Sequence, residues 1–182
     1  MRQQYLEALK PHQKVLTRHC HALCSGERSI LPQDVVQETL LKSFNRFEEY
    51  DEQGSFRAWL LQIATYTFLS MRRKAIVRKA VSLQIIPELV LEKGRMNSDD
   101  SLEAKDVLER AFKVLTKREK VALVMYHISG FPISDIAEFQ RDRSLSATKS
   151  RLSRGRKKLK TEVERLERWS VSTDNVTIVT SR

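Results

Sequence analysis

Hydrophobic residues recur at intervals of three and four along most of the chain, which is the spacing of one face of an α-helix. The first such stretch runs from about Gln3 to Leu23 and is stopped by Gly26. A second opens at Pro32, and a third follows Ser55, whose hydroxyl is suited to capping a helix N-terminus. These stretches predict a helical bundle with a core formed by Leu6, Leu9, Leu16, Leu23, Val35, Val36, Leu40, Leu41, Phe44, Phe47, Phe56, Trp59, Leu60, Ile63 and Thr67.

The helical spacing fades between Val81 and about Ser101, where Pro87, Gly94 and a polar run at 97–101 interrupt it. Strand-like alternation is hard to find before the last dozen residues. The sequence therefore predicts an all-α fold class, with two small helical domains joined by a flexible linker. The expected boundaries are 1–80 for the first domain, 81–101 for the linker, 102–169 for the second domain and 170–182 for a disordered tail.

The second domain has the pattern of a helix-turn-helix. Thr116 and Glu119 have the spacing of a capping box, and Gly130 closes the helix that they begin. A short apolar helix follows, then a polar turn at 140–143 and a long helix from about Ser144 to Trp169. The second helix of such a pair enters the major groove of DNA. The expected inner face of the long helix is Leu145, Thr148, Leu152, Gly155 and Leu159.

Charge is distributed unevenly along the chain, which has a net charge of +10 and a pI of about 9.8. Residues 141–160 contain nine Lys or Arg and one Asp, and residues 54–80 contain six Lys or Arg and no acid. Residues 34–52 instead contain six acids and two bases. Two basic blocks, one of them on a helix-turn-helix, predict phosphate binding, because lysine and arginine release the counterions condensed on DNA.

Two groups of motifs resemble the extracytoplasmic-function sigma factors of bacterial RNA polymerase, which belong to the sigma-70 family. The segment DVVQETLLKSFNRFEEYDEQGSFRAWLLQIA (34–64) is similar to the sigma-two signature of that family. The segments LTKRE (115–119), SGFPISDIAE (129–138) and TKSRLSRGRKKL (148–159) are similar to its sigma-four helix-turn-helix. The two groups occur in the order of the family with a linker between them.

The resemblance implies separate surfaces for polymerase and for DNA. Asp34, Gln37 and Glu38 would dock on the clamp helices of the largest polymerase subunit, and the flap of the second subunit is the other expected contact. Tyr50, in the loop 47–54, is the candidate for stacking on a base flipped from the start-proximal promoter element. The phosphates of that element would be held by Arg57, Arg72, Arg73 and Lys74.

The last helix would read the upstream, minus-35 element. The resemblance implies core RNA polymerase, promoter DNA and an anti-sigma factor as partners. We expect a cytoplasmic monomer without a cofactor and without membrane insertion. The residues expected to contact the upstream element are Ser146, Lys149, Ser150, Arg151, Arg154 and Arg156.

The sequence departs from the family pattern at several positions. Thr65 and Tyr66 stand where Arg-Asn is usual, and Ser70 stands where an Asp is common. The turn at 140–143 is one residue longer than usual, lacks its glycine and places Arg143 where an apolar residue is typical. Promoter preference and the register of the reading helix depend on these positions.

Other chemistry is weakly indicated. Cys20 and Cys24, with His19 and His21 beside them, allow a metal or redox site, but a buried cysteine pair in a helical core is the favoured interpretation. Phe56 and Trp59 are interpreted as core residues. Neither a Gly-rich phosphate loop nor a nucleophile elbow is present, so we expect no catalytic residue and no enzyme activity.

Two alternatives to a sigma factor remain open at the level of sequence. An autonomous helix-turn-helix regulator would bind duplex DNA as a dimer on a palindrome, without polymerase. A resolvase-like recombinase would need a catalytic serine in an α/β domain, which the scarcity of strand patterns disfavours.

Overall fold

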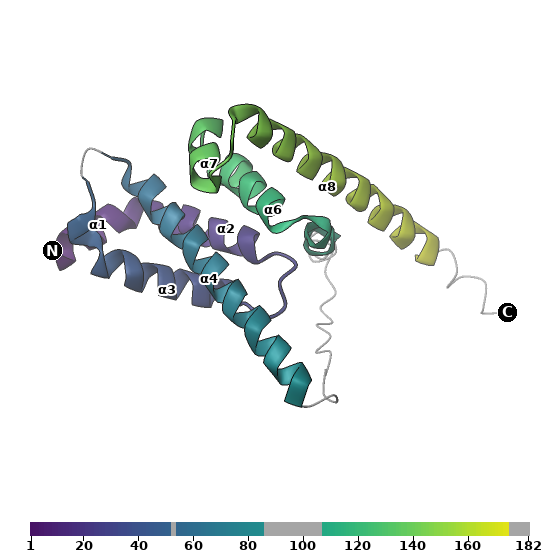
Figure 1. Cartoon of the computed structure of the whole chain (residues 1–182), viewed down its shortest axis with the longest axis horizontal. Coiled ribbons are helices and arrows are strands. Elements are labelled where there is room, and N and C mark those ends of the chain that lie inside the picture. The colour runs from purple at the N-terminus through teal and green to yellow at the C-terminus, as the bar shows by residue number, and fades with distance from the viewer. Residues whose placement is uncertain (52–53, 86–106, 175–182) are drawn as a thin grey trace.

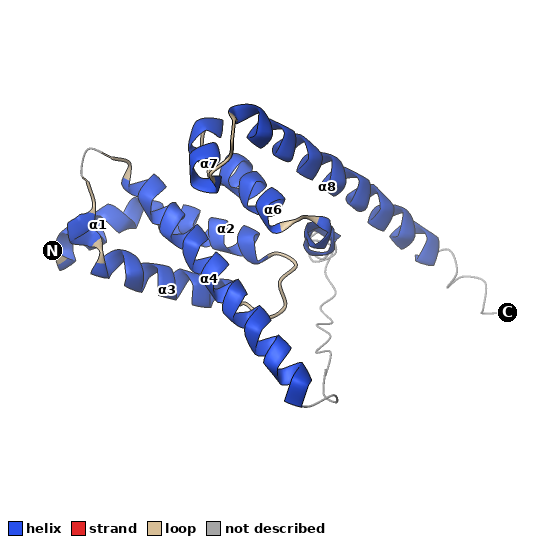
Figure 2. Ribbon diagram, viewed as in Figure 1, coloured by secondary structure: helices blue, strands red, loops and turns tan. Residues whose placement is uncertain are grey.

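Every regular element is helical in the part of the chain that the computed structural model describes, residues 1–51, 54–85 and 107–174 (Figures 1 and 2). The expected all-α fold with two helical domains is confirmed. The first domain contains α1 (Arg2–Leu9), η1 (Lys10–His12), α2 (Gln13–Cys24), α3 (Pro32–Asn45), η2 (Phe47–Glu49) and α4 (Phe56–Ile85). The second contains η3 (Phe112–Val114), α6 (Lys117–Leu123), the π-helical turn η4 (Val124–Ile128), α7 (Ile133–Gln140) and α8 (Leu145–Asp174).

The helix expected from Gln3 to Leu23 is broken into α1 and α2 by the 3₁₀ turn η1. Pro11 lies in that turn, and a proline has no N–H to donate and crowds the preceding helical turn. The break also changes which side chains face inward. Tyr5 and Leu9 are buried, whereas Leu6 is 51% exposed and does not belong to the core.

The buried apolar residues of both domains form one continuous cluster. Leu60, Leu61 and Phe68 of α4 are among its most buried members, and α4 packs against α2 and α3. Phe56 is buried and Trp59 is half-buried, as expected of core aromatics. Around Phe56 the rings of Tyr5, Phe47, Tyr50 and Trp59 form a network of edge and tilted contacts.

The second domain contains the capping box that the sequence predicted. The Thr116 hydroxyl accepts from the Glu119 amide at 3.3 Å, and the Glu119 carboxylate accepts from the Thr116 amide at 2.9 Å. The pair α7 and α8 then forms the helix-turn-helix (Figure 1). Its turn starts at Arg141, which has a φ of +51° in the left-handed region where a glycine is usually found.

Most of the expected inner face of α8 is buried. Thr148 and Leu152 are buried, and a Cβ at Gly155 would lie 2.9 Å from Cδ1 of Leu123, so the glycine permits close packing on α6. Leu145 is the exception, with 51% of its surface exposed, because it is the first residue of α8 and lies at the open end of the stripe.

Two helices extend beyond their expected ends. Helix α4 continues to Ile85, five residues into the segment expected to be a linker, and α8 continues to Asp174. The rest of the expected linker, 86–101, lies outside the described residues, as do 102–106 and the part of the tail at 175–182.

His19 joins three segments that are distant in sequence. The Thr65 hydroxyl donates to the Leu61 carbonyl at 2.8 Å, so it must accept from Nε2–H of His19, also at 2.8 Å. Nδ1 therefore carries no hydrogen and accepts from the Ser129 hydroxyl at 2.6 Å. Burial, with a smaller contribution from the Arg57 guanidinium, lowers the pKa of His19 to about 3.

Acidification should therefore destabilise the fold. Between a pH of about 6.5 and about 3, an unfolded His19 binds a proton that the folded side chain excludes. The free energy of unfolding should fall by up to about 1.4 kcal/mol for each pH unit over that range. Urea denaturation of the full chain at pH 7 and pH 5 measures this loss.

His19→Gln cannot titrate and should reduce the pH dependence. The control is His21→Gln, which removes an exposed histidine from the same helix and should leave the dependence near that of the native chain. Equal pH dependence in both variants would contradict the role given to His19.

Candidate polymerase and nucleic-acid interface

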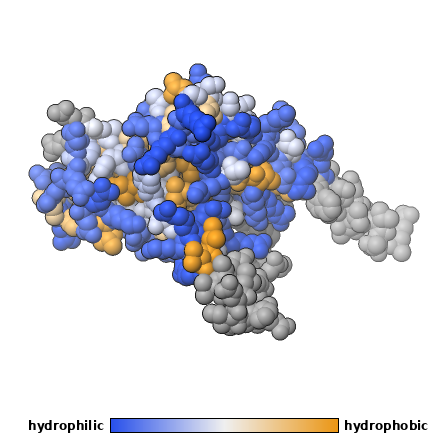
Figure 3. Space-filling model, in the orientation of Figure 1, coloured by the Kyte–Doolittle hydropathy of each residue, from blue (hydrophilic) through white to orange (hydrophobic). Residues whose placement is uncertain are grey.

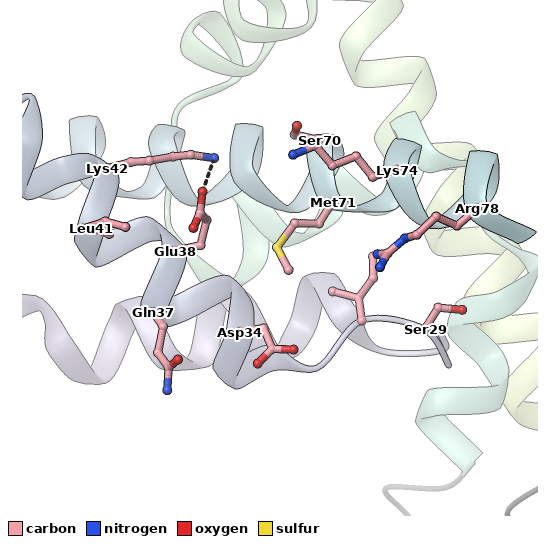
Figure 4. A pocket seen from close by; sticks show the side chains of 11 residues that line it. Ser29, Asp34, Gln37, Glu38, Leu41, Lys42, Ser70, Met71, Lys74 and Arg78 are labelled. Atoms are coloured by element: carbon pink, nitrogen blue, oxygen red, sulfur yellow. Dashed lines mark ion pairs between the residues drawn. The ribbon is translucent and has the colours of Figure 1, made fainter.

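Asp34, Gln37 and Glu38, which the resemblance assigned to polymerase docking, lie together on one side of α3. They line a cleft of about 500 Å³ between α3 and α4 (Figure 4). Lys74 and Arg78 of α4 line the opposite side, so one wall is acidic and the other is basic. Glu38 pairs with Lys42 at 3.0 Å, but both side chains are exposed and such a pair adds little stability.

Two exposed leucines extend this surface. Leu31 and Leu41 are 56% and 57% exposed, and the spacing from Leu31 through Asp34 and Glu38 to Leu41 follows one row of the helix. Leu41 was expected in the core, so that expectation was wrong. The spacing could have shown that Leu41 is exposed, because it lies on the same helical row as Asp34 and Glu38, and a row with two acidic side chains faces solvent.

The predicted DNA-binding residues of α4 fall into two pairs. Arg73 and Lys74 are exposed. Arg72 instead contacts the Glu27 carboxylate at 3.0 Å, and Arg57 donates to the Ser129 carbonyl at 2.6 Å. Arg57 and Arg72 are therefore engaged with other protein groups.

Tyr50 is half-buried. Its ring lies 5.3 Å from that of Trp59 and 5.4 Å from that of Phe56, and its hydroxyl donates to the Gly54 carbonyl. Residues 52–53 of the same loop lie outside the described residues. The structure therefore places Tyr50 at the edge of the aromatic network, and its contact with a flipped base stays a prediction.

The exposed face of α8 carries a row of donors suited to phosphates and base edges. Arg151 does not belong to it. Its guanidinium is buried, donating to both oxygens of Asp142 and to Oε1 of Gln140 at 2.6 Å. Arg151 follows Thr148 by three residues and precedes Gly155 by four, so helical spacing puts it on the inner face. The residues that are exposed are Ser146, Lys149, Ser150, Arg154 and Arg156.

These buried contacts hold the turn of the helix-turn-helix in place. Asp142 accepts from Arg151 and from the Thr148 hydroxyl at 2.6 Å, and hydrogen bonds from Arg151 lower the pKa of Asp142. The Arg118 guanidinium donates to the Gln140 carbonyl, and the Gln140 amide donates to the Arg118 carbonyl at 3.0 Å. The turn is thus held by side chains of α8, which follows it, and of α6 and α7, which precede it.

The cysteines are buried and face the core. Burial raises the pKa of Cys20 and of Cys24 to about 12, so both are protonated thiols at neutral pH. Within the described residues, no group of three or more His, Cys, Asp and Glu side chains is placed to hold a metal ion.

The surface of the face drawn in Figure 3 is mainly hydrophilic, with small separate apolar patches. Among the helices of the described segments, none is both long and apolar enough to cross a membrane.

Comparison with known proteins matches both halves of the chain. Residues 9–76 match the family model for sigma-70 region 2, and residues 105–159 match that for sigma-70 region 4. The ECF RNA polymerase sigma factor SigE of Mycolicibacterium smegmatis is 25% identical over 164 residues, which are 85% of this chain and 59% of SigE. SigG of Mycobacterium tuberculosis is 34% identical over 61 residues, 34% of this chain and 16% of SigG. The chain thus spans less than two thirds of either relative.

Two solved structures share the fold. One is the sigma factor RpoE in complex with the anti-sigma factor NepR from Bartonella quintana, with a TM-score of 0.66, 24% identity, and coverage of 90% of this chain and 96% of that chain. The other is CnrH in complex with the cytosolic domain of CnrY, with a TM-score of 0.60, 20% identity, and 90% coverage of both chains. Since both regions are matched in the order that the sequence predicted, the chain belongs to the sigma-70 family, as an extracytoplasmic-function sigma factor.

Proposed function

We propose that this chain directs core RNA polymerase to a subset of promoters and promotes the melting of their DNA. The observation that carries the proposal is the pairing of each matched region with a surface suited to its task. The region 2 match contains the acidic and apolar face of α3, and the region 4 match contains the exposed basic face of α8.

The polymerase contact is assigned to the α3 face. Asp34, Gln37 and Glu38 provide charge and hydrogen-bonding groups, while Leu31 and Leu41 provide apolar area at either end of the row. This combination suits a partner helix with basic and apolar residues, such as the clamp helices of the largest subunit. The flap of the second subunit is the proposed contact of the second domain.

Promoter contacts are assigned to two basic surfaces. The exposed face of α8 reads the upstream minus-35 element, with Lys149 and Arg154 as its central cations. Arg73 and Lys74 bind phosphates near the start site, and Tyr50 meets an unpaired base there. The phosphate contacts supply affinity, and donors to base edges supply sequence discrimination.

An anti-sigma factor is proposed as a further partner. RpoE and CnrH, which share this fold, were both solved in complex with a second protein, and NepR is an anti-sigma factor. The chain is proposed to act in the cytoplasm as a monomer.

Run-off transcription with purified bacterial core polymerase on promoter-bearing genomic fragments tests this function. Discrete transcripts that require the chain are expected, and alignment of their start sites gives the promoter sequence. An autonomous regulator would instead give no transcripts, no co-elution with core polymerase, and tight dimeric binding to duplex DNA.

Charge reversal on α3 should weaken polymerase binding. The double variant Asp34→Lys/Glu38→Lys should lower affinity for core polymerase at least tenfold, or about 1.4 kcal/mol, because it replaces attraction with repulsion at the docking surface. Titration with labelled core polymerase measures the change. Glu7→Lys, an exposed acid on α1, is the control and should bind normally. Unchanged affinity in the double variant would reject the docking role.

Two arginines on α8 should separate DNA binding from stability. Arg154→Ala should weaken promoter binding by the holoenzyme and reduce its salt dependence by about one phosphate contact, without changing the stability of the fold. Arg151→Ala should instead destabilise the second domain by about 3 kcal/mol, because the Asp142 carboxylate loses its buried partner. Thermal unfolding and filter binding over a range of salt concentrations measure both effects. Equal losses of stability in the two variants would contradict the assignment.

A further inference from the structure

The cleft between α3 and α4 carries more uncommitted positive charge than negative charge. Its lining contains two acids, Asp34 and Glu38, and three cations, Lys42, Lys74 and Arg78. Glu38 already pairs with Lys42 on its own helix. Among the residues that the structure describes, none forms an ion pair with Asp34, Lys74 or Arg78. One free carboxylate therefore faces two free cations across the cleft.

This charge balance determines what a docking partner must carry. A purely basic partner helix would be attracted by Asp34 but repelled by Lys74 and Arg78 on the opposite wall. A partner that also carries an acidic side chain satisfies both walls. We propose that core RNA polymerase docks in the whole α3–α4 cleft, and that Arg78 on the α4 wall receives an acidic side chain of the polymerase. The proposal rests on the proposed function, because it extends the surface to which polymerase docking is assigned.

Apolar side chains also line the cleft. Ile30, in the loop before α3, is buried, and Met71 of α4 is half-buried and extends toward α3 (Figure 4). On the α3 wall, Leu41 is largely exposed. A partner side chain that enters the cleft would remove this apolar surface from water. The cleft therefore combines hydrophobic burial with charge recognition, as protein interfaces do.

The exposure of the cleft favours a protein segment over a small molecule or a DNA strand. Small-molecule pockets enclose most of their ligand, whereas the charged side chains of Asp34, Lys74 and Arg78 are exposed. The two acids in the lining would repel the phosphates of a DNA strand. An amphipathic helix can present an acid and a base one turn apart on the same face. Such a helix would meet both walls of the cleft at once.

Arg78 is suited to this contact by its position and its chemistry. It follows Lys74 by four residues and Met71 by seven, so the three side chains share one side of α4. In Figure 4 the Arg78 side chain extends from α4 toward the loop that precedes α3. A guanidinium can bind a carboxylate through two parallel hydrogen bonds. Lys74 stays assigned to DNA phosphates, and its charge makes the α4 wall more positive.

Charge reversal at Arg78 tests the proposal in the absence of DNA. Arg78→Glu should lower the affinity of the labelled full chain for core polymerase at least tenfold, because the acid of the partner then meets a like charge. Arg18→Glu makes the same charge change at an exposed residue of α2 that does not line the cleft. This control should bind core polymerase as the native chain does. Both arginines are exposed, so both variants should keep the native thermal stability.

A thiol placed in the cleft tests whether polymerase occupies it. Ser70 lines the cleft and is half-buried. In the Ser70→Cys variant, alkylation by N-ethylmaleimide should become at least tenfold slower when the chain is saturated with core polymerase, again without DNA. Cys20 and Cys24 are buried, so they contribute little background. Glu7→Cys places a thiol at an exposed position of α1 and should react equally fast with and without polymerase.

The outcomes distinguish this proposal from the proposed function. Absence of binding between the native chain and core polymerase would reject the function, and the proposal with it. Normal core binding by Arg78→Glu, equal losses in Arg78→Glu and Arg18→Glu, or undiminished alkylation of Ser70→Cys in the polymerase complex would overturn the proposal alone. Weaker promoter binding by the Arg78→Glu holoenzyme, with native affinity for core polymerase, would assign Arg78 to DNA and would also overturn it.

Discussion

The arrangement of the two domains depends on one buried neutral imidazole. His19 accepts from Ser129 and donates to Thr65, so it connects α2, α4 and the end of η4 without any exposed atom. A positive charge at this place would be desolvated and would lie near the Arg57 guanidinium. The neutral tautomer with its hydrogen on Nε2 is thus the one that satisfies all three groups, and the geometry of the contact follows from it. Arg57 donates to the carbonyl of the same Ser129 whose hydroxyl bonds to His19.

Protein groups outside α4 also stabilise its strongly basic face. Residues 54–80 contain six cations and no acid, so this part of α4 has no internal compensation for its charge. Glu27, from the turn between α2 and α3, provides one partner for Arg72, and a backbone carbonyl of the second domain provides one for Arg57. Arg73 and Lys74 stay exposed. This part of α4 is therefore stabilised by partners from the turn between α2 and α3 and from the second domain.

Much of the fold and part of the site could be predicted from local sequence. The capping box, the burial of Thr148 and the common face of Asp34, Gln37 and Glu38 follow from spacing alone, because a helix fixes which neighbours share a side. Leu41 and Leu6 were wrongly expected in the core, because an apolar residue is not always buried. The break of the first helix at Pro11 was not predicted either. The engagement of Arg57 by Ser129 joins residues 72 positions apart, and no periodicity contains that information.

The turn of the helix-turn-helix illustrates how such tertiary contacts substitute for a missing local signal. Without a glycine, Arg141 takes the left-handed conformation at a cost of about 1–2 kcal/mol. The turn is held nevertheless, because Asp142 bonds to Arg151 and Thr148, and Gln140 bonds to Arg118 and Arg151. Arg151 stands in a row of basic residues and was expected to bind DNA, yet its burial is what fixes α8 relative to α7. The direction in which the exposed serines, lysine and arginines of α8 face is therefore set by an arginine that does not itself face solvent.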